Sequence, residues 1–271
     1  MPVATRAFRH GLAAVIWCLG FYAVPLVGPL AAPLGAQEAL HAPFDRLLRT
    51  HVRDGLVDYD AFARAPEFPR YLASLDTVTV SALSEDARLA YWINVYNAYT
   101  IQLVLRHQER TSIRNINRTL GFLQLKGPWN ERIVRAAGQQ YSLDQVLHRI
   151  LRKEFHEPRV HFALVPAAKG APPLRSEAYV GERLVDQLED QARRLLSDTT
   201  RTWYRNGVLG VNRVLTAYER DFGTTRKELV LFVAPYITLR PTEPQKQRLL
   251  DGMAIVQPRT YDWSLNSVRT R

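Results

Sequence analysis

The sequence has a single cysteine among its 271 residues, and that residue, Cys18, lies in an apolar N-terminal stretch. If this stretch is removed on export, the mature chain has no thiol, which excludes disulfides, thiolate metal ligands and cysteine nucleophiles. Outside the first 36 residues no apolar run approaches the roughly 20 residues that cross a bilayer, so a multi-pass membrane protein is excluded. A chain of this length can bury a core without disulfides or metals.

Lysine is also scarce, because only 5 of the 36 basic residues are lysines and the other 31 are arginines. The formal net charge is +10, and it would fall to +8 without residues 1–36, which hold two arginines and no acidic residue. The arginine excess reflects either genome composition or attraction to anionic envelope polymers or lipid headgroups, since guanidinium groups bind carboxylate and phosphate bidentately. Nucleic acid is not an expected partner, because the basic residues are scattered and no recognition module is visible.

The N-terminus has the order of a secretory signal peptide. Arg6 and Arg9 precede an apolar stretch at residues 11–27, and a small-residue segment follows up to Ala36, near which cleavage is predicted. The alternative is an uncleaved single-span membrane anchor, because the 17 residues of the apolar stretch could just cross a bilayer. The sequence therefore predicts a periplasmic or secreted protein, with an N-terminal membrane anchor as the alternative.

Helical patterns dominate the remainder of the chain. Ser84 is a good N-cap, and apolar residues then recur with helical spacing as far as Arg106. Ser142 and Gln145 form a capping box that opens a second helix, which must end before Pro158. Further helices are predicted at residues 41–51, 68–75, 182–197, 212–221 and 227–236.

Extended segments are fewer. Residues 160–165 are rich in strand-forming side chains and lie between Pro158 and Pro166, which predicts a buried strand. Residues 129–141 are typical of a small hairpin. Two further extended segments are predicted at residues 57–62 and 202–209.

The chain shows no internal repeat and no linker between residues 40 and 267. We therefore expect a single α+β domain over residues 40–267 that is predominantly helical. Its small β-sheet is expected to combine the 129–141 hairpin with the 160–165 strand.

Several separated motifs occur in an order that points to one family. They are AYWINVYNA at residues 90–98, SLDQVLHRILR at 142–152, PRVHFALV at 158–165, PPLR at 172–175 and YDWSLN at 261–266. Over roughly residues 42–267 the chain thereby resembles the exported family known as domain of unknown function 547. The resemblance implies no particular reaction.

Three positions depart from the family pattern. The resemblance implies a glutamate where this chain has Leu147, and cysteines where it has Pro166 and Ala171. Any thiol mechanism of the family therefore cannot be carried over to this chain. These departures favour a degenerate or purely binding member of the family.

Two pairs of polar residues near the motif centres are candidates for ligand binding. Asn94 and Asn97 share one face of the strongest helix, where buried amides must find partners. They either bond irregular backbone or orient a ligand. Asp262 and Asn266 carry the same two interpretations, a tie between loops or a binding role.

His148 and His161 are the candidate catalytic residues. Each is either a structural histidine or a general base. Arg175, at the end of the rigid Pro172–Pro173 loop, is a candidate for an anionic cleft. No histidine pair has the four-residue spacing of a helical zinc site, so neither a metal nor a cofactor is expected.

Two classes of function remain open, and the sequence leaves undecided whether the chain is an enzyme. The favoured one is a non-catalytic or degenerate-site envelope protein that binds a peptide, a glycan or an anionic polymer. The alternative is a thiol-independent hydrolase with His161 or His148 as general base, which requires both histidines to face one pocket beside an acid.

Overall fold

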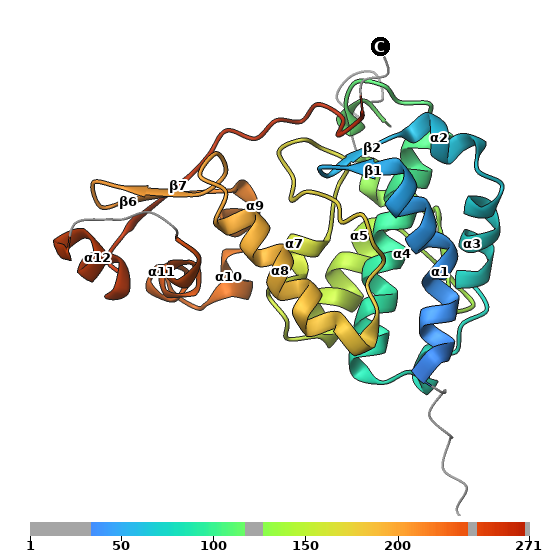
Figure 1. Cartoon of the computed structure of the whole chain (residues 1–271), viewed down its shortest axis with the longest axis horizontal. Helices are drawn as coiled ribbons and strands as arrows, with labels where there is room; N and C mark the ends of the chain where they lie inside the picture. Colours follow the sequence, from blue (N-terminus) through green and yellow to red (C-terminus); the bar gives the residue numbers. More distant parts are fainter. Residues whose placement is uncertain (1–33, 117–126, 238–242, 269–271) are drawn as a thin grey trace, which may run out of the picture. The chain divides into compact units, whose positions relative to one another are not determined.

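The computed structural model describes residues 34–116, 127–237 and 243–268 (Figure 1). These residues lie in one compact unit. The helices are α1 Leu34–His51, α2 Tyr59–Arg64, α3 Glu67–Leu75, α4 Glu85–Arg106, α5 Leu143–Gln145, α6 Arg152–Glu154, α7 Val160–Ala163, α8 Leu184–Leu196, α9 Arg213–Ala217, α10 Glu219–Phe222, α11 Arg226–Val233 and α12 Glu243–Leu250. The strands are β1 Val52–Arg53, β2 Leu56–Val57, β3 Val134–Ala136, β4 Gln139–Tyr141, β5 Trp203–Arg205, β6 Val208–Val211 and β7 Ile255–Pro258. The predicted fold class, a mainly helical α+β protein with small sheets, is confirmed.

The described residues form two clusters of buried hydrophobic side chains, and helix α4 is the central element of the first one. The Ser84 hydroxyl caps it by accepting a hydrogen bond from the Ala87 amide at 3.3 Å, as the sequence predicted. Between Ala87 and Val104 almost every residue is buried, so the helix is covered by other parts of the protein on all sides. Helices α1, α2, α3 and α5 pack against it (Figure 1).

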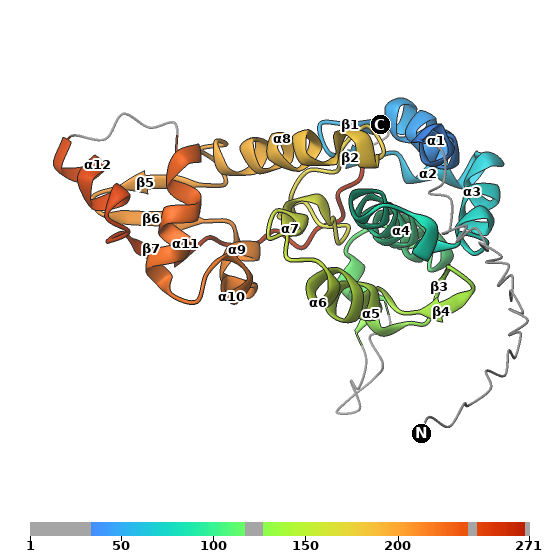
Figure 2. The same ribbon diagram turned by 90° about the horizontal axis from the view of Figure 1, so that it is seen from below.

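A second hydrophobic cluster lies around the three-stranded sheet. Strands β5 and β6 form an antiparallel hairpin, and β7 pairs with β6 in parallel. The buried side of α11, which includes Leu229 and Val233, packs in the same cluster as Leu209 and Val256 of the sheet (Figure 2). Helix α8 joins the two clusters, because Leu188 belongs to the first and Leu195 to the second.

The C-terminal segment after β7 runs back to the first cluster. It forms a parallel bridge between Ser267 and Val57 and an antiparallel bridge between Leu265 and Ala168. The Gly170 amide donates to the Asp262 carbonyl at 2.8 Å. Residues 261–268 therefore connect the β1–β2 hairpin with the loop that follows α7.

The predicted strand at residues 160–165 is wrong. Residues Val160–Ala163 form the short helix α7, and the Leu164 amide donates to the Val160 carbonyl at 3.2 Å. The Ala163 carbonyl and the Val165 amide bond the side chain of Asn97, so no neighbouring strand uses them. The small sheet is consequently not built from this segment.

Other elements are confirmed only in part. The 129–141 hairpin is present as β3 and β4, whereas Pro128–Asn130 forms a 3₁₀ turn. The capping box of Ser142 is present, but the helix continues as a π-helix over Val146–Leu151. The extended segment at 57–62 is wrong beyond β2, because Asp58 caps α2 by accepting from the Ala61 amide at 2.9 Å.

The segment at 202–209 is a hairpin and not one strand. Asn206 and Gly207 both have positive φ, +50° and +78°, which is the geometry of a tight type I′ turn. Most of the predicted signal peptide lies outside the described residues, and its last three residues begin α1. The predicted domain boundaries, residues 40–267, stay a prediction. In the part of the chain that the structure describes, no helix has the length and apolarity to cross a bilayer.

Candidate functional site

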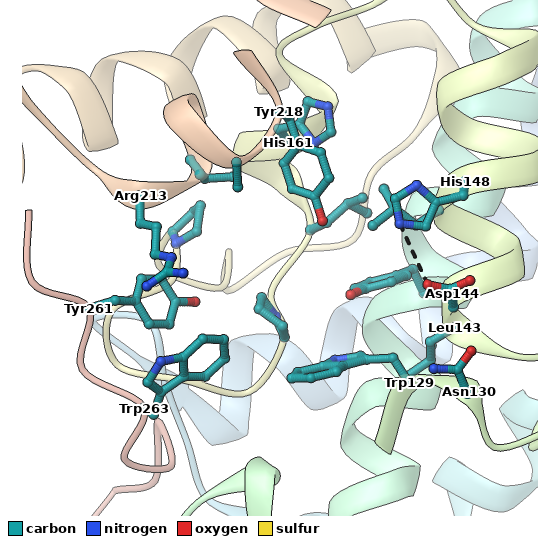
Figure 3. A pocket seen from close by; sticks show the side chains of 17 residues that line it. Trp129, Asn130, Leu143, Asp144, His148, His161, Arg213, Tyr218, Tyr261 and Trp263 are labelled. Carbon is teal, nitrogen blue, oxygen red and sulfur yellow. Dashed lines mark ion pairs between the residues drawn. The ribbon is translucent and has the colours of Figure 1, made fainter. Parts of the chain in front are cut away.

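A pocket of about 240 Å³ is formed by side chains that come from both hydrophobic clusters and from the C-terminal segment (Figure 3). Its lining residues are Tyr96, Trp129, Asn130, Leu143, Asp144, Leu147, His148, His161, Leu164, Pro166, Pro172, Arg213, Val214, Ala217, Tyr218, Tyr261 and Trp263. The pocket is thus assembled from segments far apart in the sequence.

Aromatic side chains dominate the pocket wall. The rings of Tyr261 and Trp263 lie 4.4 Å apart, and the Trp129 ring lies 6.1 Å from that of Trp263. Burial raises the pKa of Tyr96 and of Tyr261, so both phenols stay neutral. The wall therefore presents large apolar faces with a few neutral polar edges.

His161 lies at the top of the pocket in Figure 3, with its ring stacked on that of Tyr218 at 4.2 Å. Its Nε2 lies 2.7 Å from Oδ2 of Asp221. Burial lowers the pKa of His161 to about 4, although the Asp221 carboxylate acts in the opposite direction. At neutral pH the ring is therefore neutral, and Nε2 carries the proton that it donates to Asp221.

His148 faces the same pocket in a different state of hydrogen bonding. Arg152 Nη1 lies 2.8 Å from Nδ1 of His148, and a guanidinium can only donate, so Nδ1 is the acceptor. The proton of the neutral ring is then on Nε2, which lies 3.5 Å from Oδ1 of Asp144 (Figure 3).

Arg152 and Asp221 connect the two histidines. Arg152 binds Asp221 bidentately, with Nε–Oδ2 at 2.5 Å and Nη2–Oδ1 at 2.7 Å. Burial alone would raise the pKa of Asp221, but hydrogen bonds from Arg152 and His161 lower it below its ordinary value. The ionised carboxylate holds the His161 ring, and the same arginine holds the His148 ring.

The binding roles expected for Asn94 and Asn97 are not supported by their placement. Asn94 donates to the Tyr179 carbonyl at 2.7 Å and accepts from its amide at 3.0 Å. Asn97 bonds the Ala163 carbonyl at 2.9 Å and the Val165 amide at 3.0 Å. Both amides are buried, and neither lines the pocket, so they tie the loops around α7 and before α8 to helix α4.

Arg175 also lies away from the pocket. Its guanidinium binds Glu177 and Asp190, and its side chain is 10% exposed. Burial acts to raise the pKa of Glu177, but hydrogen bonds from Arg175 and its neighbours bring it to about 2. The arginine is thus neutralised locally.

The side chains of Asp262 and Asn266 both make hydrogen bonds within the protein. The Asp262 carboxylate accepts from the Ser264 amide at 2.8 Å and from its hydroxyl at 2.6 Å. Asn266 accepts from the Tyr59 hydroxyl at 2.6 Å and donates to the Gly55 carbonyl at 3.2 Å. Neither residue lines the pocket. Of the residues proposed from sequence, the pocket brings together only the two histidines.

Sequence reasoning missed the aromatic residues that make the wall. Tyr261 and Trp263 flank Asp262 in the closing motif, and both line the pocket although Asp262 does not. In an extended segment, side chains two apart point to the same face, so the alternation around Asp262 was the available signal. Trp129 and Arg213 carry no such signal, because only the tertiary fold brings them here.

The positions that depart from the family pattern belong to the same region. Leu147 and Pro166 line the pocket, and Ala171 is buried next to the lining residue Pro172. Among the lining residues that the structure describes there is no serine, threonine, lysine or cysteine that could serve as a nucleophile. Among the described residues, no group of three or more histidine, cysteine and acidic side chains is arranged to hold a metal ion.

The fold and the pocket define a mainly helical α+β protein with an aromatic pocket. Comparison with known families gives a match to part of the chain. The family model described as "Protein of unknown function, DUF547" matches residues 80–196. This match confirms the resemblance to that family, and the matched span includes His148 and His161, whereas the closing motif at 261–266 lies outside it. Neither the curated proteins nor the solved structures provide a match to the chain.

Proposed function

We propose that this chain is an exported envelope protein that binds a small ligand in the aromatic pocket without catalysis. The observation that carries the proposal is the wall of Tyr96, Trp129, Tyr218, Tyr261 and Trp263 around a pocket of about 240 Å³. Small-molecule sites are typically concave and largely apolar, with a few polar groups that fix orientation. The size suits one or two ring or residue units, which means a short piece of a peptide or glycan and not a long polymer segment.

The state of the histidines argues for binding over proton transfer. A general base needs a free ring nitrogen aimed at the reacting group. His148 Nδ1 accepts from Arg152, and its other nitrogen carries the proton. His161 Nε2 donates to Asp221, which leaves Nδ1 as the unprotonated ring nitrogen, but burial lowers the pKa of this histidine to about 4, which makes Nδ1 a weak base.

One observation favours the alternative, a thiol-independent hydrolase. His148 and His161 line the same pocket, and Asp144 lies beside His148. Such an enzyme would use water as nucleophile, because the described lining residues offer no hydroxyl of serine or threonine. Hydrolysis of a bound peptide or glycan that is lost in His161→Ala would favour it over pure binding.

Calorimetric titration tests the binding function with three probes: a mixture of short peptides, a disaccharide of N-acetylglucosamine, and polyglutamate. We expect one probe to bind and Trp263→Ala to weaken it at least tenfold, a loss of about 1.4 kcal/mol. Trp203→Ala is the matched control, because Trp203 lies in β5 outside the pocket. Absence of binding by all three probes, or an equal loss in both variants, would overturn the proposal.

Export is tested separately by mass spectrometry of the protein recovered from the envelope fraction. The expected mass is that of a chain that begins after Ala36. A full-length mass in the membrane fraction would favour the uncleaved anchor instead.

A further inference from the structure

The pocket carries two charged side chains of opposite sign that have little or no compensation. They are Asp144 and Arg213, which lie on opposite sides of the pocket in the view of Figure 3. Resting on the binding function proposed above, we propose that the ligand is a zwitterionic peptide fragment, with a free ammonium group at Asp144 and a free carboxylate at Arg213.

Asp144 has room for a cationic partner. Its side chain is 45% exposed, and its one ion-pair contact is His148 Nε2 at 3.5 Å, which is longer than a normal hydrogen bond. A carboxylate offers about four acceptor sites, and an ammonium group supplies three donors. Among the described residues that line the pocket, Asp144 is the one with an acidic side chain.

Arg213 has no partner of its own. Within the described chain its exposed guanidinium makes neither a hydrogen bond nor an ion pair, although it lies beside the Tyr261 ring (Figure 3). Its planar guanidinium matches a carboxylate bidentately. His161 adds no positive charge to the pocket at neutral pH, because burial lowers its pKa to about 4. The negative group of a ligand therefore finds its counter-charge at Arg213.

The two other ligand classes fit this charge arrangement less well. A neutral glycan would leave both Asp144 and Arg213 without an opposite charge. An anionic polymer would meet one arginine and would be repelled by Asp144. Charge-assisted hydrogen bonds are roughly twice as strong as neutral ones, so a ligand with both charges gains the most. Between the charges, the aromatic wall suits an apolar or aromatic amino-acid side chain.

The probe is a pool of dipeptides made from alanine, leucine and phenylalanine, prepared with free ends, N-acetylated, C-amidated or capped at both ends. Binding is followed by the NMR signals of the indole N–H groups of Trp129 and Trp263. We expect the free pool to shift both signals, each single cap to weaken binding about tenfold, and the double cap to weaken it further.

Charge-neutralising variants assign each end of the ligand. Asp144→Asn is expected to bind the free and the N-acetylated pools equally, and Arg213→Gln the free and the C-amidated pools equally. Asp186→Asn and Arg220→Gln are matched controls, because both residues are exposed and lie outside this pocket. Asp186 also shares with Asp144 a place in the first turn of its helix.

The outcomes separate the two proposals. If the doubly capped pool or the N-acetylglucosamine disaccharide shifts the indole signals as well as the free pool does, the zwitterion inference is wrong and the binding function stands. If no probe shifts either signal, both proposals fail. If capping weakens binding but the two pocket variants behave like their controls, the assignment of charges to Asp144 and Arg213 is overturned.

Discussion

Two sets of polar residues differ in how much of their hydrogen-bonding capacity the protein itself uses. Their comparison separates residues that stabilise the fold from residues that can bind a ligand. Asn94 and Asn97 on α4 use the donor and the acceptor of each amide on backbone groups 2.7–3.0 Å away. In the pocket, the guanidinium of Arg213 has no partner in the described chain, and the carboxylate of Asp144 has a single long contact. A polar residue whose hydrogen bonds are complete stabilises the fold, whereas one with unused capacity can meet a ligand.

The largest expected difference between the two sets is in stability. Asn97→Ala leaves the Val165 amide and the Ala163 carbonyl without partners inside the protein, which we expect to lower the free energy of unfolding by about 3 kcal/mol. Asn130→Ala makes the same change at an exposed residue of the pocket rim and should cost less than about 0.5 kcal/mol. Urea unfolding measures both. Equal losses of unfolding free energy in the two variants would show that Asn97 and Asn130 do not differ in their contribution to the fold.

The second prediction concerns acid. The pKa of His161 is about 4 in the folded protein and 6.5 in the unfolded chain, so between these values the unfolded state binds more protons. The contribution of His161 to the free energy of unfolding should therefore fall by about 3 kcal/mol as the pH drops from above 6.5 to 4. His161→Gln should flatten this slope, which chemical unfolding at a series of pH values would reveal.

His41 gives the acid experiment a second, independent contribution. It is buried, and burial lowers its pKa to about 3, so part of the slope should persist in His161→Gln. His156→Gln is the control, because His156 is exposed. A slope that is the same in the wild type and in His161→Gln would contradict the assignment.

The third prediction is a substitution that should lower both the stability of the protein and its affinity for the ligand. Gly55 has φ +79°, and a Cβ at this position would lie 2.5 Å from Cβ of Pro173, next to the lining residue Pro172. Gly55→Ala should cost about 2 kcal/mol and weaken ligand binding as the loop shifts. Gly138→Ala, at φ +72° with no atom within 4 Å, should cost less and leave binding unchanged. A loss of stability without any change in binding would uncouple the loop from the pocket.

The smallest expected effect is a change in one pKa. The Asp221 carboxylate is the group that acts to raise the pKa of His161 against burial. In Asp221→Asn we therefore expect that pKa to fall below about 4, as measured by NMR titration of the ring protons. Asp186→Asn should leave it unchanged. A rise in the pKa of His161 in Asp221→Asn would contradict the role assigned to the Asp221 carboxylate.

Local signals predicted the helices well and the site poorly. Ser84 and Ser142 cap their helices as expected, because capping depends on residues only three apart. The strand expected at 160–165 is α7 because Asn97, more than 60 residues earlier in the chain, takes its backbone groups. His148 and His161 were identified from motifs, but Trp129 and Arg213 belong to the pocket only through the tertiary fold.

The return of residues 261–268 to the first cluster has a consequence for biogenesis. These residues bond Val57, Thr111 and Gly170, and they supply Tyr261 and Trp263 to the pocket. During synthesis, the ribosome releases this segment long after α1–α4, so the nascent chain cannot complete the pocket until residues 261–268 have emerged. A pocket that closes this late would suit the export proposed above, in which the chain stays unfolded until it has crossed the membrane.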